Sequence, residues 1–166
     1  MRRLATILVA KDIAFVAELA SMEFKHVLVP TDFGEPSARA LKLAVDLARS
    51  FSAMLTLLHA YEVPLYTYPQ VDSIVVDLFT PIEQAAREQL DRELATVQQE
   101  LPSAKSILRS GVPWREILNV LDEIKADLVV MGTHGRRGVS HALLGSVAEK
   151  VVRLSPVPVL TVRDSG

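Results

Sequence analysis

The sequence predicts an α/β fold built on a parallel sheet with both faces covered. From His26 onward, short β-branched runs alternate with longer helical patterns, and several of these runs are too apolar to keep one face in water. Such alternation is typical of βαβ units, and strands that are buried on both faces read as near-continuous apolar runs. A chain of 166 residues is long enough to form one such domain around one core.

Five strands are expected in chain order, with helices between them. The strands are His26–Pro30, Met54–Ala60, Ala104–Arg109, Asp127–Met131 and Val157–Arg163. Two apolar faces recur at helical spacing and are expected to pack on the sheet. The first face comprises Ser37, Ala40, Leu41, Ala44, Val45 and Ala48, and the second comprises Ile82, Ala86, Leu90, Leu94, Val97 and Leu101.

The later helices carry start signals. Pro113 opens a helix whose inner face begins with Trp114 and Ile117, because proline is favoured at the first helical position. Ser146 and Glu149 form a capping box, which predicts Ser146 as the N-cap of the last helix. The stretch from Glu62 to Phe79 lacks helical period and predicts a loop at the carboxyl edge of the sheet, where ligands of open α/β sheets bind.

The first 21 residues are treated as an N-terminal extension of uncertain role, and residues 22–166 as the domain. Arg2 and Arg3 precede the apolar run LATILVA, but Lys11 and Asp12 interrupt it. A secretory signal needs roughly 7 to 15 uninterrupted apolar residues, so a soluble, cytoplasmic protein is expected. The segment TILVAKD also echoes HVLVPTD, His26 to Asp32, and competes with it as the first strand. Both an appended extension and a true N-terminal helix stay open for residues 1–21.

Composition narrows the class of function. The formal charge of −2 does not indicate a strongly basic surface for nucleic acid, and the absence of cysteine excludes disulfides and thiolate metal sites. The histidines lack an established ligand spacing, and His59, in an apolar strand, is expected to be a packed, hydrogen-bonded residue. No nucleophile motif of the GxSxG type is present. We therefore expect no catalytic residue and no metal site made by the protein alone.

A glycine-rich stretch, Met131 to Ser146, lies between a strand and a helix start. Glycine allows close backbone approach to a ligand, and a helix N-terminus offers unpaired N–H groups to an anion. Neither the P-loop nor the GxGxxG fingerprint is present. The stretch by itself predicts an anion site of another α/β type, with a nucleotide as the leading ligand.

The spacing Gly132, two residues, Gly135, nine residues, Gly145 and then Ser146 resembles the signature of the ATP-binding branch of the universal stress protein family. The likeness runs from His26 to Arg163 and includes VLVPTDFGEPSARAL, LTLLHAYE, GVPWREIL and EKVVRLSPVPVLTVR. It implies a five-stranded, doubly wound, Rossmann-like sheet of the flavodoxin-like order 3-2-1-4-5, with helices on both faces. It also implies a homodimer through the last strand and ATP binding with little turnover.

The resemblance assigns residues to the nucleoside. Pro30, Thr31 and Asp32 match the turn that faces adenine and ribose, and Tyr61 matches a position whose backbone meets the adenine edge. Met131 and Gly132 are implied to lie beside the nucleoside. Asp32 could instead cap the helix that begins near Pro36, or help hold a cation bound with the nucleotide.

Two groups are implied to hold the phosphates. Gly135, Arg136 and Arg137 bend around them, although adjacent surface arginines are often only solvated. Gly145, Ser146 and Val147 offer helix N-terminal N–H groups, and the Ser146 hydroxyl either donates to phosphate or caps the helix.

The last strand predicts a partner. An apolar edge strand such as Val157 to Arg163 tends to pair with another chain, here a second copy, unless the N-terminal extension covers it. The leading hypothesis is a cytoplasmic, homodimeric ATP-binding sensor or regulator of the stress response, holding ATP, AMP or ADP with magnesium or manganese, and no nucleic acid or membrane. Two alternatives are a slow metal-dependent ATPase, which uses Asp32 with Arg136 or Arg137, and a nucleotide-independent interaction module.

Overall fold

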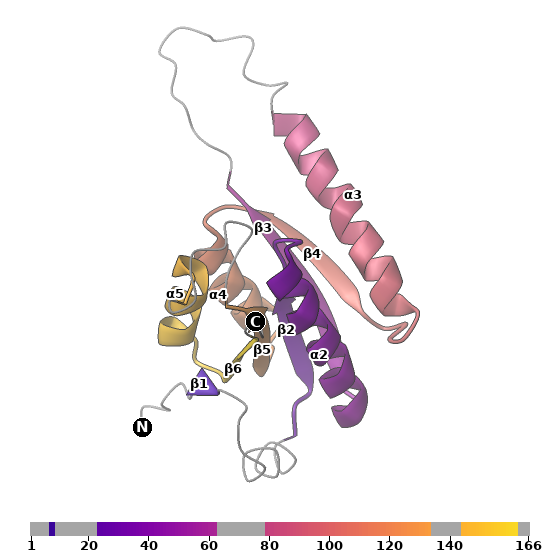
Figure 1. Cartoon of the computed structure of the whole chain (residues 1–166), viewed down its shortest axis with the longest axis vertical. Coiled ribbons are helices and arrows are strands. Elements are labelled where there is room, and N and C mark those ends of the chain that lie inside the picture. The colour runs from indigo at the N-terminus through magenta and orange to yellow at the C-terminus, as the bar shows by residue number, and fades with distance from the viewer. Residues whose placement is uncertain (1–6, 9–22, 63–78, 134–143, 163–166) are drawn as a thin grey trace, which may run out of the picture.

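Parallel strands β1-β6-β5-β2-β3-β4, in this spatial order, form the sheet of the protein (Figure 1). The computed structural model describes residues 7–8, 23–62, 79–133 and 144–162. The strands are β1 (Ile7–Leu8), β2 (His26–Pro30), β3 (Met54–Tyr61), β4 (Lys105–Ser110), β5 (Leu128–Gly132) and β6 (Val159–Val162). The helices are α2 (Glu35–Phe51), α3 (Phe79–Gln98), α4 (Pro113–Glu123) and α5 (Ser146–Leu154).

The five expected strands and their order are confirmed, since β4-β3-β2-β5-β6 is the order 3-2-1-4-5. The bounds of β2 agree with the expected ones, and those of β3, β4 and β5 differ by one residue. Strand β6 begins two residues later than expected, and its expected last residue, Arg163, lies outside the described residues. Strand β3 continues to Tyr61 because Tyr61 is still paired with Ser110 of β4. Strand β6 begins at Val159, after Pro156 and Pro158, which have no N–H to donate to a ladder.

One strand was not among the five expected. Ile7 and Leu8 form β1, which pairs in parallel with Val159 and Leu160 of β6. The echo between TILVAKD and HVLVPTD therefore includes a true strand, but it lies at the margin of the sheet and not at its centre. The proposed division at residue 22 stays a prediction.

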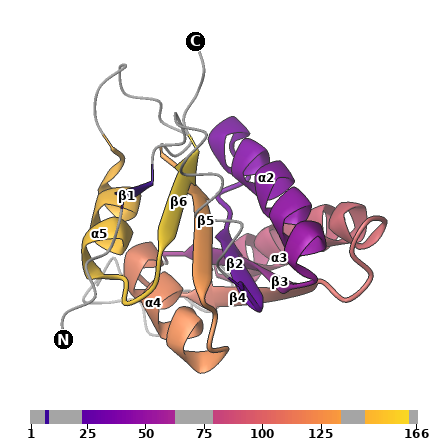
Figure 2. The same ribbon diagram turned by 90° about the horizontal axis from the view of Figure 1, so that it is seen from below.

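Helices cover both faces of the sheet (Figures 1 and 2). Because side chains alternate along a strand, Val27 and Val29 of β2 belong to the core cluster on the α2 and α3 face, whereas Leu28 belongs to the cluster on the α4 and α5 face. The face of α2 is made of small residues, and Ala40, Ala44 and Ala48 are fully buried. This lets the α2 backbone lie close to the middle of the sheet.

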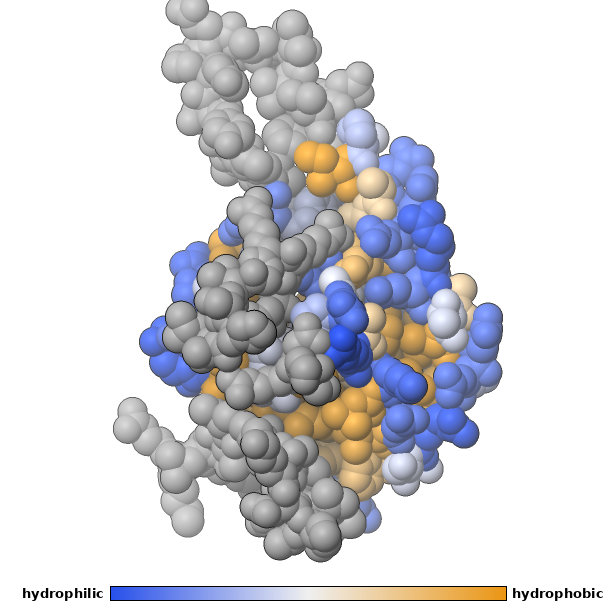
Figure 3. Space-filling model, viewed as in Figure 1, coloured by the Kyte–Doolittle hydropathy of each residue, from blue (hydrophilic) through white to orange (hydrophobic). Residues whose placement is uncertain are grey.

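The second expected apolar face is confirmed except at its first residue. Ala86, Leu90 and Val97 of α3 are buried, but Ile82 is 44% exposed. Hydrophilic residues gather over α3, at the right of Figure 3, as expected for an amphipathic helix. No helix in the described ranges is long and apolar enough to span a membrane.

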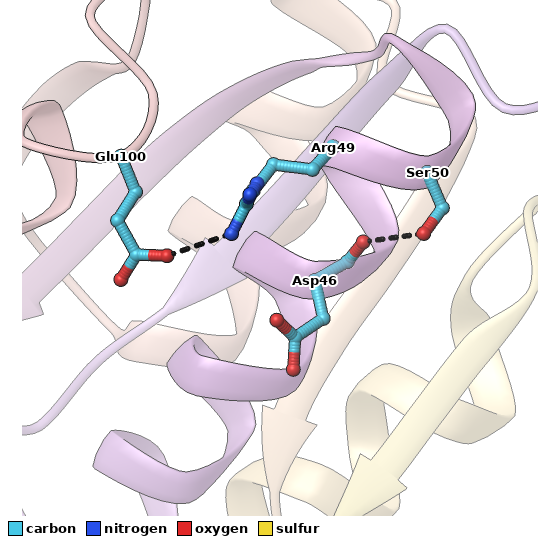
Figure 4. A network of polar contacts seen from close by, with 4 residues as sticks. All are labelled: Asp46, Arg49, Ser50 and Glu100. Carbon is cyan, nitrogen blue, oxygen red and sulfur yellow. Dashed lines mark hydrogen bonds and ion pairs between the residues drawn. The ribbon is translucent and has the colours of Figure 1, made fainter.

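An ion pair joins the far end of α2 to the turn after α3. Arg49 Nη1 lies 3.0 Å from Glu100 Oε2 (Figure 4). In the same region the Ser50 hydroxyl donates to the Asp46 carbonyl, with an O···O distance of 2.8 Å. Both charged side chains are more than half exposed, so the pair contributes at most about 1 kcal/mol to folding. Packing of the apolar faces holds these helices in place.

Candidate functional site

The candidate site lies where β2 and β5 end side by side. Strand β2 continues into α2 on one face of the sheet, whereas β5 leads toward α5 on the opposite face. The two connections leave in opposite directions, and the crevice outside the carboxyl ends of such strands is where open α/β sheets bind ligands. Pro30, Thr31, Asp32, Met131 and Gly132 all lie at this edge.

The turn from β2 to α2 is organised by its own polar groups. The Phe33 N–H donates to Thr31 Oγ1 at 3.0 Å, and the Gly34 N–H donates to Asp32 Oδ1 at 3.0 Å. The Ser37 hydroxyl donates back to the Gly34 carbonyl at 2.8 Å. Phe33 has a φ of 62°, a left-handed conformation that is strained for a bulky residue and typical of functional turns. The turn is thus a preorganised wall of the crevice.

Asp32 has a local structural role. Its carboxylate holds the N–H of Gly34, and Gly34 is the N-cap of α2 without a side-chain capping bond of its own. Asp32 therefore orders the residues just before the helix and does not cap the helix directly. Its side chain is half-buried at the crevice, so this role leaves the ligand-facing role open.

An aromatic stack lies behind the turn. His59 Nδ1 donates to the Thr31 carbonyl at 2.7 Å, since a carbonyl can only accept. The His59 ring lies 4.3 Å from the Phe33 ring and 6.4 Å from the Tyr61 ring, measured between centroids. The expectation of a packed, hydrogen-bonded His59 is confirmed, and the stack supports Phe33 in its strained conformation.

Glu93 of α3 is a site residue that the sequence analysis missed. Its carboxyl group hydrogen-bonds the Thr31 side chain, and its Oε2 is buried with no hydrogen-bond partner among the described residues. Burial raises the pKa of Glu93, and the nearby negative charge of Asp32 adds to the increase. A signal was present, because Glu93 follows Leu90 by three residues and precedes Val97 by four, on the buried face of α3.

The register of β3 decides which of its backbone groups face the crevice. The Leu58 carbonyl accepts from Thr31 N at 2.8 Å on the β2 side, and the Tyr61 carbonyl accepts from Gly111 N at 2.9 Å on the β4 side. Backbone groups of successive strand residues point to alternate sides. The N–H and C=O of Ala60, two residues after Leu58, therefore point past the end of β2, and those of Tyr61 point away.

Gly132 has a packing reason to be glycine. A Cβ at this position would lie 2.8 Å from the Pro36 carbonyl carbon and 2.9 Å from its Cβ. The first turn of α2 thus rests directly on the end of β5. Met131, by contrast, is only 5% exposed and packs in the core beside α4 and α5, so its side chain is not part of the crevice surface.

The two ends of the glycine-rich loop are joined. The Gly145 N–H donates to the Thr133 carbonyl at 2.7 Å, and the Thr133 N–H donates to the Val162 carbonyl at 3.0 Å. Thr133 and Gly145 therefore lie next to each other beside the end of β6. Gly135, Arg136 and Arg137 lie outside the described residues.

Helix α5 begins at the crevice edge. Gly145 is its N-cap, Ser146 is its first helical residue, and no side-chain capping bond is made there. The expected capping box is therefore wrong, because Ser146 lies one position too far into the helix to act as N-cap. Ser146 is exposed and Val147 is half-buried. First-turn N–H groups have no partner within a helix, so this end of α5 can hold an anion.

The described residues contain no group of three or more histidine, aspartate or glutamate side chains arranged to hold a metal ion. The carboxyl groups of Asp32 and Glu93 both lie at the Thr31 turn.

Comparisons with known proteins agree with this arrangement. A model of the universal stress protein family matches residues 23–163. A universal stress protein of Methanocaldococcus jannaschii is 32% identical over 143 residues, which cover 84% of this chain and 82% of that protein.

Solved structures share the fold. Universal stress protein UspA from Lactobacillus plantarum superposes with a TM-score of 0.76 at 24% identity, covering 86% of this chain and 100% of that one. A universal stress protein solved in complex with cAMP superposes with a TM-score of 0.62 at 26% identity, covering 85% of this chain and 98% of that one. The family match over most of the chain, on a sheet of the expected strand order, shows that the protein belongs to the universal stress protein family.

Proposed function

We propose that the protein binds an adenine nucleotide, with ATP as its main ligand, in the crevice between the β2–α2 turn and the start of α5. The observation that carries this proposal is the arrangement of the crevice, with a preorganised turn from Thr31 to Gly34 on one side and the N-terminus of α5 on the other. The complete glycine signature and the cAMP complex of a family member support it.

In this proposal, the nucleoside lies against Pro30, Thr31 and Asp32. Adenine carries an amino donor beside a ring-nitrogen acceptor, and adjacent backbone C=O and N–H groups complement that pair. The backbone of Ala60 has the orientation to offer both groups, whereas the Tyr61 carbonyl is already bonded to Gly111. We therefore transfer the backbone role from Tyr61 to Ala60. Asp32 accepts from the ribose hydroxyls, or helps hold magnesium or manganese with the nucleotide.

The phosphates lie at Gly145, Ser146 and Val147, where the helix dipole and the first-turn N–H groups favour negative charge. The charges of Arg136 and Arg137 would add to this attraction. Binding, rather than turnover, is the proposed event, in a cytoplasmic sensor or regulator of the stress response. AMP and ADP share the nucleoside contacts and are expected to bind at the same place.

A glycine variant tests this site. Gly145 has φ −59° and ψ 150°, which any L-residue adopts, so Gly145→Val is expected to fold. The added side chain would prevent close approach of phosphate, and ATP affinity measured calorimetrically with magnesium should fall by about 100-fold or more, since one lost charge-assisted site of about 3 kcal/mol has this effect.

Leu154→Val is the matched control, because Leu154 is exposed at the other end of α5. It should bind ATP as the wild type does. Unchanged affinity in a folded Gly145→Val protein would refute the site. Mass spectrometry of the freshly purified, gently denatured protein should also reveal bound nucleotide. Metal-dependent phosphate release that is lost in an Asp32→Ala variant that still binds ATP would favour the slow ATPase instead.

A further inference from the structure

Strand β6 is paired on both of its edges. On one side Val159 to Val162 pair with β5 from Val129 to Gly132. On the other side Val159 and Leu160 pair with Ile7 and Leu8 of β1 (Figures 1 and 2). The family match begins at residue 23, so the outer strand comes from a segment that the shared domain does not include.

If β1 were absent, the edge strands of the sheet would be β4 and β6. These two strands differ in how well they resist pairing with another chain. Strand β4, at one margin, carries Lys105 and Arg109, and Arg109 forms an ion pair with Glu123. Charged side chains of this kind keep an edge from pairing with another chain. Strand β6 is VLTV and carries no charge. Without β1 it would present an uncharged edge of unpaired N–H and C=O groups, which templates pairing with a second strand.

We propose that the segment carrying Ile7 and Leu8 is an intramolecular cover of the β6 edge, which excludes a second copy of this chain from β6. The Pro158 and Val162 carbonyls accept from the β5 side, so the N–H and C=O groups of Val159, between them in the alternation, point to the β1 side and can form only one ladder. Pairing with β1 and pairing with a second copy along this edge of β6 are therefore mutually exclusive at Val159. Association of two copies through the last strand requires β1 to leave first.

Because β1 and β6 belong to the same chain, pairing between them is favoured over pairing of β6 with a second copy. A segment tethered by a short linker has an effective concentration on the order of millimolar at its site, whereas a second copy is present at micromolar concentration in a typical preparation. To displace β1 from β6 in half of the chains, the second copy must bind β6 about a thousandfold more tightly than β1 does. The free chain is then a monomer, and any signal that removes β1 turns it into a dimer.

Cysteine pairs test whether β1 lies on the β6 edge of its own chain. The chain has no cysteine, so an Ile7→Cys and Val159→Cys double variant introduces a single pair, at positions that face each other in the ladder. Oxidation should give a disulfide within one chain, seen as a monomer on a non-reducing gel and by a mass loss of two hydrogens. In the control, Ile7→Cys with Val162→Cys, the pair lies three residues out of register, about 10 Å along the strand, which is too far to bridge.

The location of β1 is refuted by disulfide-linked dimers, which would mean that β1 pairs with another molecule, and also by the absence of any disulfide in the matched pair. This readout needs no change in association. It remains decisive if the proline variant below fails to fold.

A proline in β1 tests the exclusion itself. Leu8→Pro in the full chain removes an N–H and disrupts the strand, while Leu8→Val keeps a good strand former as the matched control. Sedimentation velocity at micromolar concentration should give a monomer for the wild type and for Leu8→Val. Leu8→Pro should dimerise about tenfold more tightly or better, as expected when a tethered competitor is lost. Equal association of all three proteins would overturn the proposal, whether they are all monomers or all dimers.

Discussion

At the scale of single residues, Gly132 shows how one position of the glycine signature serves the fold. The resemblance implied that Gly132 lies beside the nucleoside, and the structure adds that a Cβ there would meet the Pro36 backbone at 2.8 Å. Real Cβ atoms essentially never approach other atoms so closely, so the glycine permits α2 to rest on β5. The same contact fixes where the β2–α2 turn lies relative to the end of β5.

Gly132→Ala is therefore expected to reduce stability, because the backbone of α2 would have to move. Overpacking of this kind typically costs about 1–3 kcal/mol, measured as a lower midpoint in urea unfolding. Gly34→Ala is the matched control. There the atoms nearest to the new Cβ belong to the Asp32 side chain, the first at 3.1 Å, and Gly34 has a φ of −87°, which alanine adopts. Coincident unfolding curves for Gly132→Ala and the wild type would contradict the packing explanation.

At the scale of elements, the position of α3 along the sheet decides which of its apolar residues are buried. Leu90 is 2% exposed and belongs to the core on the α2 and α3 face, whereas Ile82, two turns earlier, is 44% exposed. Helical spacing shows which side of a helix faces the sheet, but it does not show how far the sheet extends beneath the helix. The apolar face of α3 recurs regularly along the sequence, but only part of it is buried.

A pair of truncations on α3 follows from this difference. Leu90→Ala should lower the free energy of unfolding by about 2–5 kcal/mol, as for a buried leucine that leaves a cavity. Ile82→Ala should change it by about 0.5 kcal/mol or less, as for a surface site. Chemical unfolding monitored by circular dichroism measures both values. Similar losses for the two variants would mean that Ile82 is packed as well as Leu90 is.

At the scale of the whole molecule, His26 joins three elements at the edge of the sheet opposite the crevice. Its Nδ1 donates to the Ile124 carbonyl after α4 at 3.1 Å, and its Nε2 accepts from the Thr56 hydroxyl of β3 at 2.9 Å. Asp127 receives the His26 and Lys25 N–H groups from the side of β5. Burial lowers the pKa of His26 below its usual value of about 6.5, although the Ile124 bond and the Asp127 charge oppose the decrease.

The sign of the resulting pH dependence follows from this lowered pKa. Below about pH 6.5 the unfolded chain takes up a proton at His26 more readily than the folded chain does, so stability is lost as the pH falls toward the lowered value. The urea midpoint of the wild type should therefore decrease between about pH 7.5 and about pH 5.5. His26→Gln should show a smaller decrease, because its side chain does not titrate. An equal decrease in both proteins would show that other groups control this pH range.

Much of the fold could be predicted because local patterns determine it. The run HVLVP followed by Thr31 and Asp32 defined the bounds of β2, and the alternation of strands and helices indicated parallel pairing. The turn at Thr31 and Asp32 was also found from sequence, and the start of α5 was predicted to within one residue. Ser146 was misplaced by one position, because serine followed by Glu149 reads as a capping box whichever residue begins the helix.

Residues whose position depends on long-range contacts could not be predicted from the hydrophobic periodicity of the sequence. Glu93 lies beside Thr31 because α3 packs over β3 and β4, next to the end of β2. The Ala60 backbone points past the end of β2 because β2 ends opposite Leu58. Both relations depend on register and packing between elements that are distant in sequence, which periodicity within one element does not contain.

The sequence by itself determined the class of fold, the strand order through the family resemblance, and the neighbourhood of the site, because composition, period and turn chemistry are local properties. Only the tertiary structure decided that Gly132 lies against α2, that the Tyr61 carbonyl is bonded to Gly111 on the β4 side, and that Ile7 and Leu8 pair with β6. The physical reason is the same in each case. Close packing and ladder hydrogen bonds join residues far apart in the chain, and a ladder edge can be satisfied by any strand that reaches it.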